Sequence, residues 1–211
     1  ETVNLGKELE HRDFVISAPA GLSSVKAKVI GVIENQAPTK ALEFDLPVEQ
    51  GEVRVEGDVC YLSLVERHRG TGAVVNGFVS GFGYTGSMAI ASSVAHDSHH
   101  MIVVGTNQEM MAAAANRLGE IGGGVSVWKD GSEVALVELP IAGLMSDSKA
   151  SEVAVKAQAI VTAMIDCGCT LNNAYMQHTL LALVVIPELR ISDLGLVDVN
   201  RFELTEIIKN S

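Results

Sequence analysis

The sequence contains few aromatic residues, few cysteines and fewer basic than acidic residues. Aromatic residues make up 4% of the 211 positions, and 26 acidic residues against 15 basic ones give a net charge of −11 at pH 7. This composition argues against nucleic acid as a partner, because stacking platforms and phosphate contacts need aromatic rings and positive charge. It argues equally against an anionic membrane surface. Three cysteines are too few for a disulfide scaffold and indicate a reducing, cytoplasmic setting.

Long hydrophobic runs are also absent. The nearest approach, Leu180–Pro187, is far shorter than the roughly 20 apolar residues that a membrane-spanning helix needs. With 47% hydrophobic and 19% charged residues, the chain is nevertheless too apolar to be disordered, and it is long enough for a buried core. The first residue is Glu1 rather than methionine, and no signal-like segment follows it. We therefore expect a piece of a longer polypeptide.

Two subregions differ in their patterns. Residues 1–69 are expected to be mostly β, because apolar and β-branched runs alternate there with proline and glycine. The predicted strands in this subregion are Phe14–Ser17, Val25–Ile33, Ala41–Leu46 and Cys60–Val65. Residues 70–211 mix both kinds of element, beginning with two short buried strands at Met88–Val94 and Met101–Val104.

Helix and turn signals follow in the second subregion. Thr106 and Glu109 have the spacing of a capping box, so a helix is predicted to begin after Thr106 and to stop at Gly122. The dipeptide Asp130-Gly131 predicts a β-hairpin turn. A second helix is predicted over Lys149–Asp166. These elements indicate an α+β fold, a layered sandwich of mixed β-sheet with helices packed on one side.

Glycines cluster between Gly70 and Gly86, but the cluster does not match a nucleotide-binding motif. Neither the GxxxxGK[ST] phosphate loop nor the GxGxxG fingerprint is present. We expect these glycines to permit close approach of the backbone to a substrate or to a neighbouring segment.

The segment Ala91–His100 is the strongest candidate for chemistry. His96, His99 and His100 lie within five residues of one another together with Asp97. Imidazole and carboxylate groups are ligands for Zn, Mn or Fe, and they are also proton carriers near neutral pH. The alternative is a polar turn whose histidines are simply solvated. Because two apolar strands flank the cluster, the functional interpretation is favoured.

Three other groups are weaker candidates. The charged run Glu66–Arg69 ends a predicted strand, where it could bind a substrate or form an ordinary solvated loop. Cys167 and Cys169 are interpreted as two buried thiols at a helix end. Glu188 is expected to pair with Arg190 in the interior.

Several stretches together resemble the C-terminal region of bacterial adenine deaminases of the amidohydrolase superfamily. They occur in the family's order and cover nearly the whole chain. The matching stretches are Val65–His68, Gly77–Gly83, Ile90–His99, Ile102–Asn107, Pro140–Asp147, Val185–Arg190, Gly195–Val199 and Phe202-Glu203.

The resemblance implies hydrolytic deamination of adenine to hypoxanthine and ammonia in purine salvage. In that family a binuclear Mn or Fe centre in a (β/α)8 barrel activates the attacking hydroxide. The barrel's His-x-His metal motif is absent from this chain. Residues 1–211 are therefore expected to form the C-terminal domain alone, with an N-terminal amidohydrolase barrel domain and adenine as partners, in a homo-oligomer.

The resemblance also frames the predicted site. Catalytic roles are predicted for His96, Asp97 and His99, and an auxiliary metal site for His96, His99 and His100. Substrate-binding roles are predicted for Glu66, His68, Gly81, Ser92 and Ser93. The alternative function is a non-catalytic binding or oligomerisation module with a histidine-rich metal or purine site. A free-standing hydrolase is the least favoured interpretation, because the chain supplies only one dense cluster of ligands.

Overall fold

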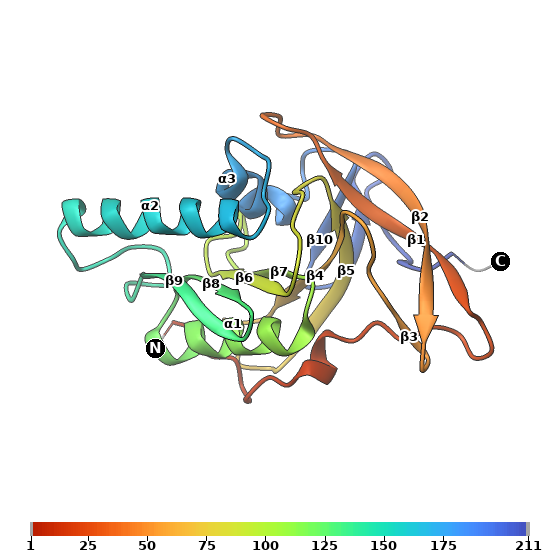
Figure 1. The fold of residues 1–211 in the computed structure, drawn as a ribbon, viewed down its shortest axis with the longest axis horizontal. Coiled ribbons are helices and arrows are strands. Elements are labelled where there is room, and N and C mark those ends of the chain that lie inside the picture. The colour runs from red at the N-terminus through yellow and green to blue at the C-terminus, as the bar shows by residue number, and fades with distance from the viewer. Residues whose placement is uncertain (1, 210–211) are drawn as a thin grey trace.

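The structure, a computed structural model, describes residues 2–209 and is built on a nine-stranded sheet (Figure 1). The strand order is β3-β2-β1-β5-β4-β7-β6-β8-β9, and every neighbouring pair is antiparallel except β1 and β5. The mixed sheet predicted from the sequence is thus confirmed. The strands are β1 (Ser24–Val32), β2 (Thr39–Glu49), β3 (Glu52–Val53), β4 (Val59–Val65), β5 (Val74–Ser80), β6 (Met88–Ser92), β7 (Met101–Gly105), β8 (Gly124–Lys129) and β9 (Ser132–Glu138).

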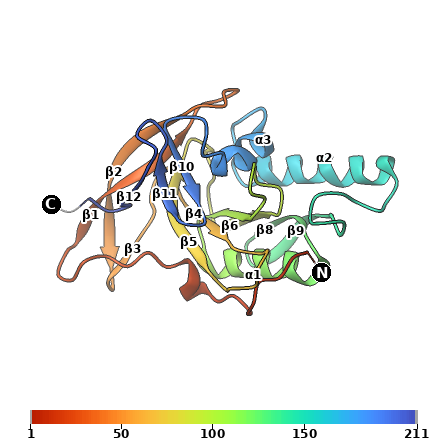
Figure 2. The ribbon, with the colours of Figure 1, turned by 180° about the vertical axis from the view of Figure 1, so that it is seen from behind.

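Helices and a second, three-stranded sheet complete the domain. The small sheet has the order β10-β11-β12, and its strands β10 and β11 contact β5 of the large sheet (Figure 2). The remaining elements are η1 (His11–Phe14), α1 (Gln108–Ile121), α2 (Ala150–Asp166), α3 (Ala174–Thr179), η2 (Leu180–Ala182), β10 (Leu189–Ser192), β11 (Gly195–Asp198) and β12 (Glu203–Thr205).

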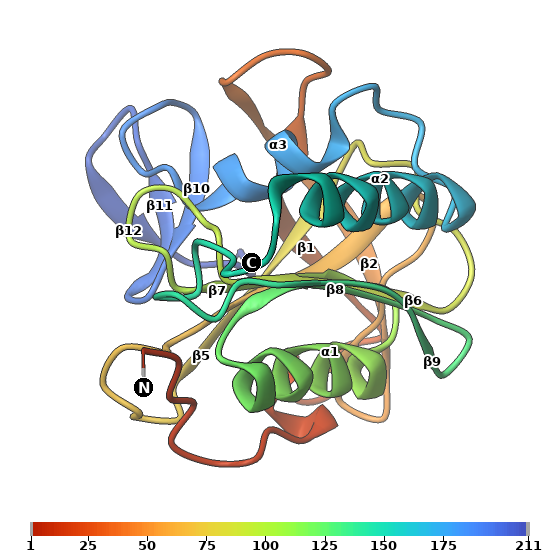
Figure 3. The ribbon, with the colours of Figure 1, turned by 90° about the vertical axis from the view of Figure 1, so that its left-hand side faces the viewer.

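The helices cover both faces of the large sheet, not one side as predicted (Figure 3). One hydrophobic cluster packs α1 through Met111 and Leu118, and a second cluster packs α2 through Ile160 and Met164. The central strands β4, β6 and β7 are buried at every position, so both of their faces need cover. The α+β class is confirmed, and the layering is corrected to helix, sheet, helix.

The predicted helix and hairpin signals are confirmed with one correction. Helix α1 is capped by Asn107, whose side chain accepts from Met110 N, and not by Thr106. The Thr106 hydroxyl instead donates to Gly86 O and accepts from Met88 N, which ties the helix start to β6. Gly122 ends α1 in the left-handed conformation as expected.

The predicted strand Phe14–Ser17 is absent. This segment forms the end of η1 and a single bridge from Ser17 to Glu52, because the Phe14 side chain turns into the core and the segment does not pair in a ladder.

Of the helices formed by residues 2–209, none combines the length and the apolar character needed to cross a membrane.

Candidate functional site

Strand register brings two charged loops to one edge of the large sheet. Val65 at the end of β4 pairs with Val74 at the start of β5 and with Met101 at the start of β7, and β6 ends beside them. The loop 66–73 and the loop 93–100 therefore emerge side by side. We call these two loops the histidine edge.

Glu66 organises the first loop of the histidine edge. Its Oε1 accepts from His68 N (2.5 Å) and Arg69 N (2.8 Å), and its Oε2 accepts from Thr71 N (3.1 Å) and Thr71 Oγ1 (3.0 Å). Burial alone would raise the pKa of Glu66, but these hydrogen bonds outweigh it and lower the pKa to about 2. The carboxylate is ionised and fully engaged by its own loop, which suits it to shaping a site.

Arg67 ties the histidine edge to two other segments. It is 2% exposed, and its guanidinium donates to His99 O (2.5 Å), Thr2 O (2.8 Å), Ala142 O (3.2 Å) and Ser93 O (3.5 Å). Within residues 2–209 no carboxylate pairs with it. The buried guanidinium of Arg67 thus holds three segments in fixed positions. They are the N-terminal segment, the loop 93–100 at both of its ends, and the loop before α2.

The second buried arginine contradicts a predicted pairing. Arg190 is 1% exposed and donates to the carbonyl oxygens of Ile186, Leu180 and Ala37, rather than to Glu188. The Glu188 carboxylate accepts from Ala41 N instead. Sequence proximity suggested an ion pair, but the two side chains bond to different segments of the chain.

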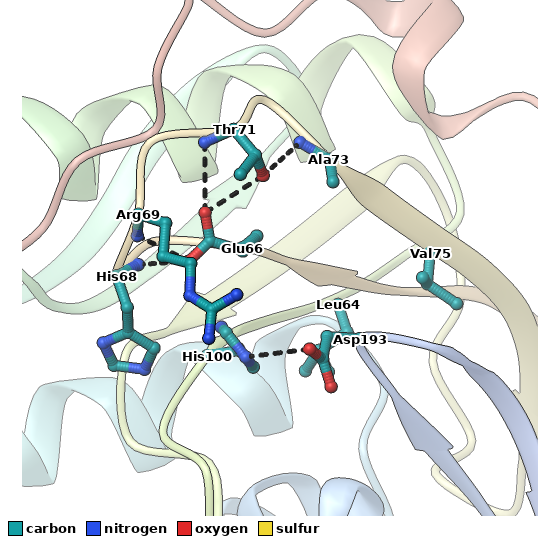
Figure 4. A pocket seen from close by; sticks show the side chains of 9 residues that line it. All are labelled: Leu64, Glu66, His68, Arg69, Thr71, Ala73, Val75, His100 and Asp193. Carbon is teal, nitrogen blue, oxygen red and sulfur yellow. Dashed lines mark hydrogen bonds and ion pairs between the residues drawn. The ribbon is translucent and has the colours of Figure 1, made fainter.

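A pocket of about 300 Å³ opens between the histidine edge and the turn after β10 (Figure 4). His68 and His100 contact each other with ring centroids 4.7 Å apart, and His100 Nε2 lies 3.7 Å from Asp193 Oδ2. The guanidinium of Arg69 extends toward the centre of the pocket (Figure 4). Burial and the neighbouring His68 lower the pKa of His100, so its imidazole is neutral at neutral pH. The pocket therefore offers a neutral imidazole, a cation and a carboxylate to a ligand.

His96 and His99 form a second ring pair outside the lining of this pocket. Their centroids are 5.3 Å apart in an edge-to-face arrangement, and His99 Nδ1 accepts from Ala95 N. Burial and the neighbouring His96 lower the pKa of His99. Asp97 lies beside them and is exposed to solvent. The imidazole of His99 can therefore accept a proton at neutral pH.

The structure does not bring the three predicted metal-ligating histidines together. His96 and His99 pair with each other, whereas His100 pairs with His68. Across residues 2–209, no three histidine, cysteine, aspartate or glutamate side chains are placed to hold a metal ion.

The predicted substrate-binding residues separate into three groups. Glu66 and His68 line the pocket. Ser92 and Ser93 are fully buried, and their hydroxyls bond Val94 and Gly143, respectively, so the structure gives them supporting positions behind the loop. Gly81 lies beyond the opposite end of β5, about 20 Å from Glu66 along the sheet, where its amide binds Asp58. The structure therefore does not place Gly81 with the other candidates.

The sequence did not single out two residues of the site. Arg67 is indistinguishable from the exposed Arg69 in a charged run, because only tertiary packing decides which of them is buried. Asp193 comes from the turn between β10 and β11, far from the histidine loop in sequence. An isolated aspartate in a turn is ordinary turn chemistry.

Comparison of the sequence with known proteins identifies the family. The chain belongs to the adenine deaminase C-terminal domain family, which it matches over residues 36–203.

Individual relatives agree with this assignment. The chain is 68% identical over 211 residues to an adenine deaminase of Ruegeria pomeroyi and 68% identical over 210 residues to one of Roseobacter denitrificans. An adenine deaminase of Moorella thermoacetica is 44% identical over 209 residues. These matches cover 98 to 100% of this chain but 35% of each relative. The chain thus spans about a third of the length of these curated relatives.

Proposed function

We propose that the chain is the C-terminal part of an adenine deaminase, which hydrolyses adenine to hypoxanthine and ammonia in purine salvage. The observation that carries the proposal is the 68% identity that extends over 99% of the chain to a protein named adenine deaminase. Because the chain spans 35% of that relative, the proposal includes a barrel domain supplied by the remaining polypeptide. The three unpaired thiols among residues 2–209 fit a cytoplasmic location.

The metal chemistry of this reaction is assigned to the barrel. A Mn or Fe centre would supply the activated water. The side chains of residues 2–209 do not fit such a centre, since they offer no group of three ligands.

The histidine edge is proposed to face the substrate mouth of that barrel. Asp97 is exposed, His96 and His99 are partly exposed, and the pKa of His99 is lowered, so His99 can accept a proton at neutral pH. The adjacent pocket offers His68, Arg69 and Asp193 for polar contacts with a heterocycle. Arg67 fixes the loop 66–73 against the loop 93–100, because its guanidinium donates a hydrogen bond to the carbonyl oxygen of His99. In this proposal His96, Asp97 and His99 move protons, and the pocket binds substrate or product.

A chimera tests the proposal. This chain would replace the matching segment of the Ruegeria pomeroyi adenine deaminase, to which it is 68% identical. We expect the chimera to release hypoxanthine and ammonia from adenine at a rate within about tenfold of the unmodified relative. A folded chimera that leaves adenine unchanged, while the unmodified relative consumes it, would refute the proposal.

The role of the histidine edge is tested in the same chimera. His96→Ala and His99→Ala are each expected to lower kcat/KM about a hundredfold, the usual scale for a lost proton carrier. His11→Ala is the matched control, because His11 is exposed in η1 and lines neither the histidine edge nor its pocket. Unchanged turnover and unchanged metal content in both loop variants would remove the loop from the mechanism.

A non-catalytic assembly module is the second candidate function. Helix α2 favours it, because the apolar side chains of Val155, Val161 and Ile165 are exposed on its surface. The two functions are compatible, since one surface of a domain can serve assembly while another serves a site.

A further inference from the structure

Arg69 differs from the other six arginines of the chain, because its guanidinium has no partner within residues 2–209. The buried Arg67 and Arg190 donate to carbonyl oxygens. The other four form ion pairs with carboxylates; they are Arg12, Arg54, Arg117 and Arg201. In a chain of net charge −11, a guanidinium that extends unpaired into a pocket is available to a ligand (Figure 4).

Asp193 supplies the opposite charge in the same pocket. Its side chain is 47% exposed, and its carboxylate lies 3.7 Å from His100 Nε2, which is longer than a hydrogen bond. Glu66, the other carboxylate of the pocket, is already engaged by its own loop. The open charges of Arg69 and Asp193 therefore cancel. This balance favours a neutral ligand with both acceptor and donor atoms over a phosphate, which the two carboxylates would repel.

The size and the lining of the pocket fit one flat heterocycle. Its volume of about 300 Å³ is at the lower end of the range for small-molecule sites, which suits a single base better than a nucleotide. Leu64 of β4 and Val75 of β5 supply apolar lining, and the rings of His68 and His100 lie beside each other. The His68 ring is held in place because its Nε2 donates to Ser98 O (2.8 Å). A planar ligand can therefore pack against fixed apolar and imidazole surfaces.

The two purines of the proposed reaction differ in the atoms that they offer to these charges. A 6-oxopurine such as hypoxanthine presents O6 and N7 as adjacent acceptors, the pair that a guanidinium binds with two hydrogen bonds. Adenine carries an amino group in place of O6, so two donors would face each other there. Hypoxanthine also has an N1–H donor for a carboxylate, whereas N1 of adenine is an acceptor.

We propose that this pocket binds the 6-oxopurine product in preference to adenine. Arg69 donates to O6 and N7, and Asp193 accepts from a ring N–H. The two side chains line one pocket without pairing with each other, which leaves the space between them to the ring. The inference rests on the proposed function, which makes hypoxanthine the purine that is released.

Calorimetric titration of the purified chain with hypoxanthine and with adenine tests the preference. The chain packs a hydrophobic cluster on each face of its large sheet, so it has a core of its own. Hypoxanthine should bind at least about tenfold more tightly than adenine, the discrimination expected of one bidentate pair. Equal affinities for the two purines, or no binding of hypoxanthine at millimolar concentration, would overturn the inference.

Arg69→Gln tests the residue that carries the preference. A glutamine amide pairs with the amino group and N7 of adenine, so the variant should bind hypoxanthine at least about tenfold more weakly and should prefer adenine. Arg69 is exposed, so the variant is expected to fold normally. Arg12→Gln is the matched control, because Arg12 is exposed in η1 and lies outside the pocket, and it should leave both affinities unchanged. An unchanged preference in Arg69→Gln would refute the assignment.

The binding result and the proposed function can fail separately. A chimera that deaminates adenine, combined with a chain that does not bind hypoxanthine, would retain the function and refute the product site. A chimera that leaves adenine unchanged, combined with selective binding of hypoxanthine by the chain, would refute the function and support the assignment of the pocket.

Discussion

Two adjacent residues, Glu66 and Arg67, show how this chain buries charge without ion pairs. The carboxylate of Glu66 is satisfied by amides and a hydroxyl of its own loop. The guanidinium of Arg67 is satisfied by carbonyl groups of three separate segments. Glu66 therefore fixes a local loop, whereas Arg67 fixes the arrangement of distant ones. Such fully hydrogen-bonded charges stabilise a defined geometry and are costly to disrupt.

Replacing Arg67 by methionine should destabilise the protein by roughly 3 kcal/mol. The substitution leaves the carbonyls of Thr2, His99 and Ala142 without their donor, and a buried unsatisfied carbonyl costs about 1 to 3 kcal/mol. Urea unfolding would measure the change in free energy. Arg69→Met is the control, and its expected change is below about 0.5 kcal/mol because Arg69 is exposed. Equal losses in the two variants would contradict the structural role of Arg67.

Glu66 makes the stability depend on acid. Its pKa of about 2 in the folded protein lies below the ordinary 4.5, so its stabilisation is present above pH 4.5 and is lost as the pH falls toward 2. At neutral pH, Glu66→Gln should cost roughly 2 to 3 kcal/mol. The difference between wild type and variant should shrink steadily below pH 4.5. A difference that stays constant down to pH 2 would show that the carboxylate charge is not the cause.

Helix α1 shows where reasoning from sequence succeeds and where it stops. The helix and its glycine stop are local features and were predictable, and so were the hairpin at Asp130-Gly131 and most strands of the large sheet. The cap shifted by one residue because Thr106 has a better partner in β6, which only the tertiary structure reveals. The cover on both sheet faces was missed for a related reason. Short runs such as Met101–Gly105 do not show which layer will pack on each side.

The observed cap makes a prediction for α1. Asn107→Ala should destabilise the protein by about 1 kcal/mol, because Met110 N loses its acceptor. Asn107→Asp should retain the stability, since a carboxylate accepts the same hydrogen bond and suits the positive end of the helix dipole. Thermal unfolding of both variants measures the effect. A loss of equal size in Asn107→Asp would mean that the side chain acts through some other contact.

At the scale of the whole molecule, strand register decides which candidate residues reach one site. The histidine edge lies where β4 and β6 end. The segment 96–100 was found from sequence because its histidines are adjacent in the chain. The contributions of Arg67 and Asp193 could not be found, because strand register and a distant turn bring them to the site. Close spacing also suggested one three-histidine metal site, which the folded loop divides into two ring pairs.

Metal content and adenine turnover test most directly whether this chain is one part of a larger enzyme. Both would be measured on the purified 211-residue chain and on the chimera with the Ruegeria pomeroyi protein, each supplied with Mn or Fe. We expect neither stoichiometric metal nor turnover for the chain alone, and both for the chimera. Stoichiometric metal together with turnover in the chain alone would contradict this expectation. The histidine edge would then be a complete active site and not one part of a larger enzyme.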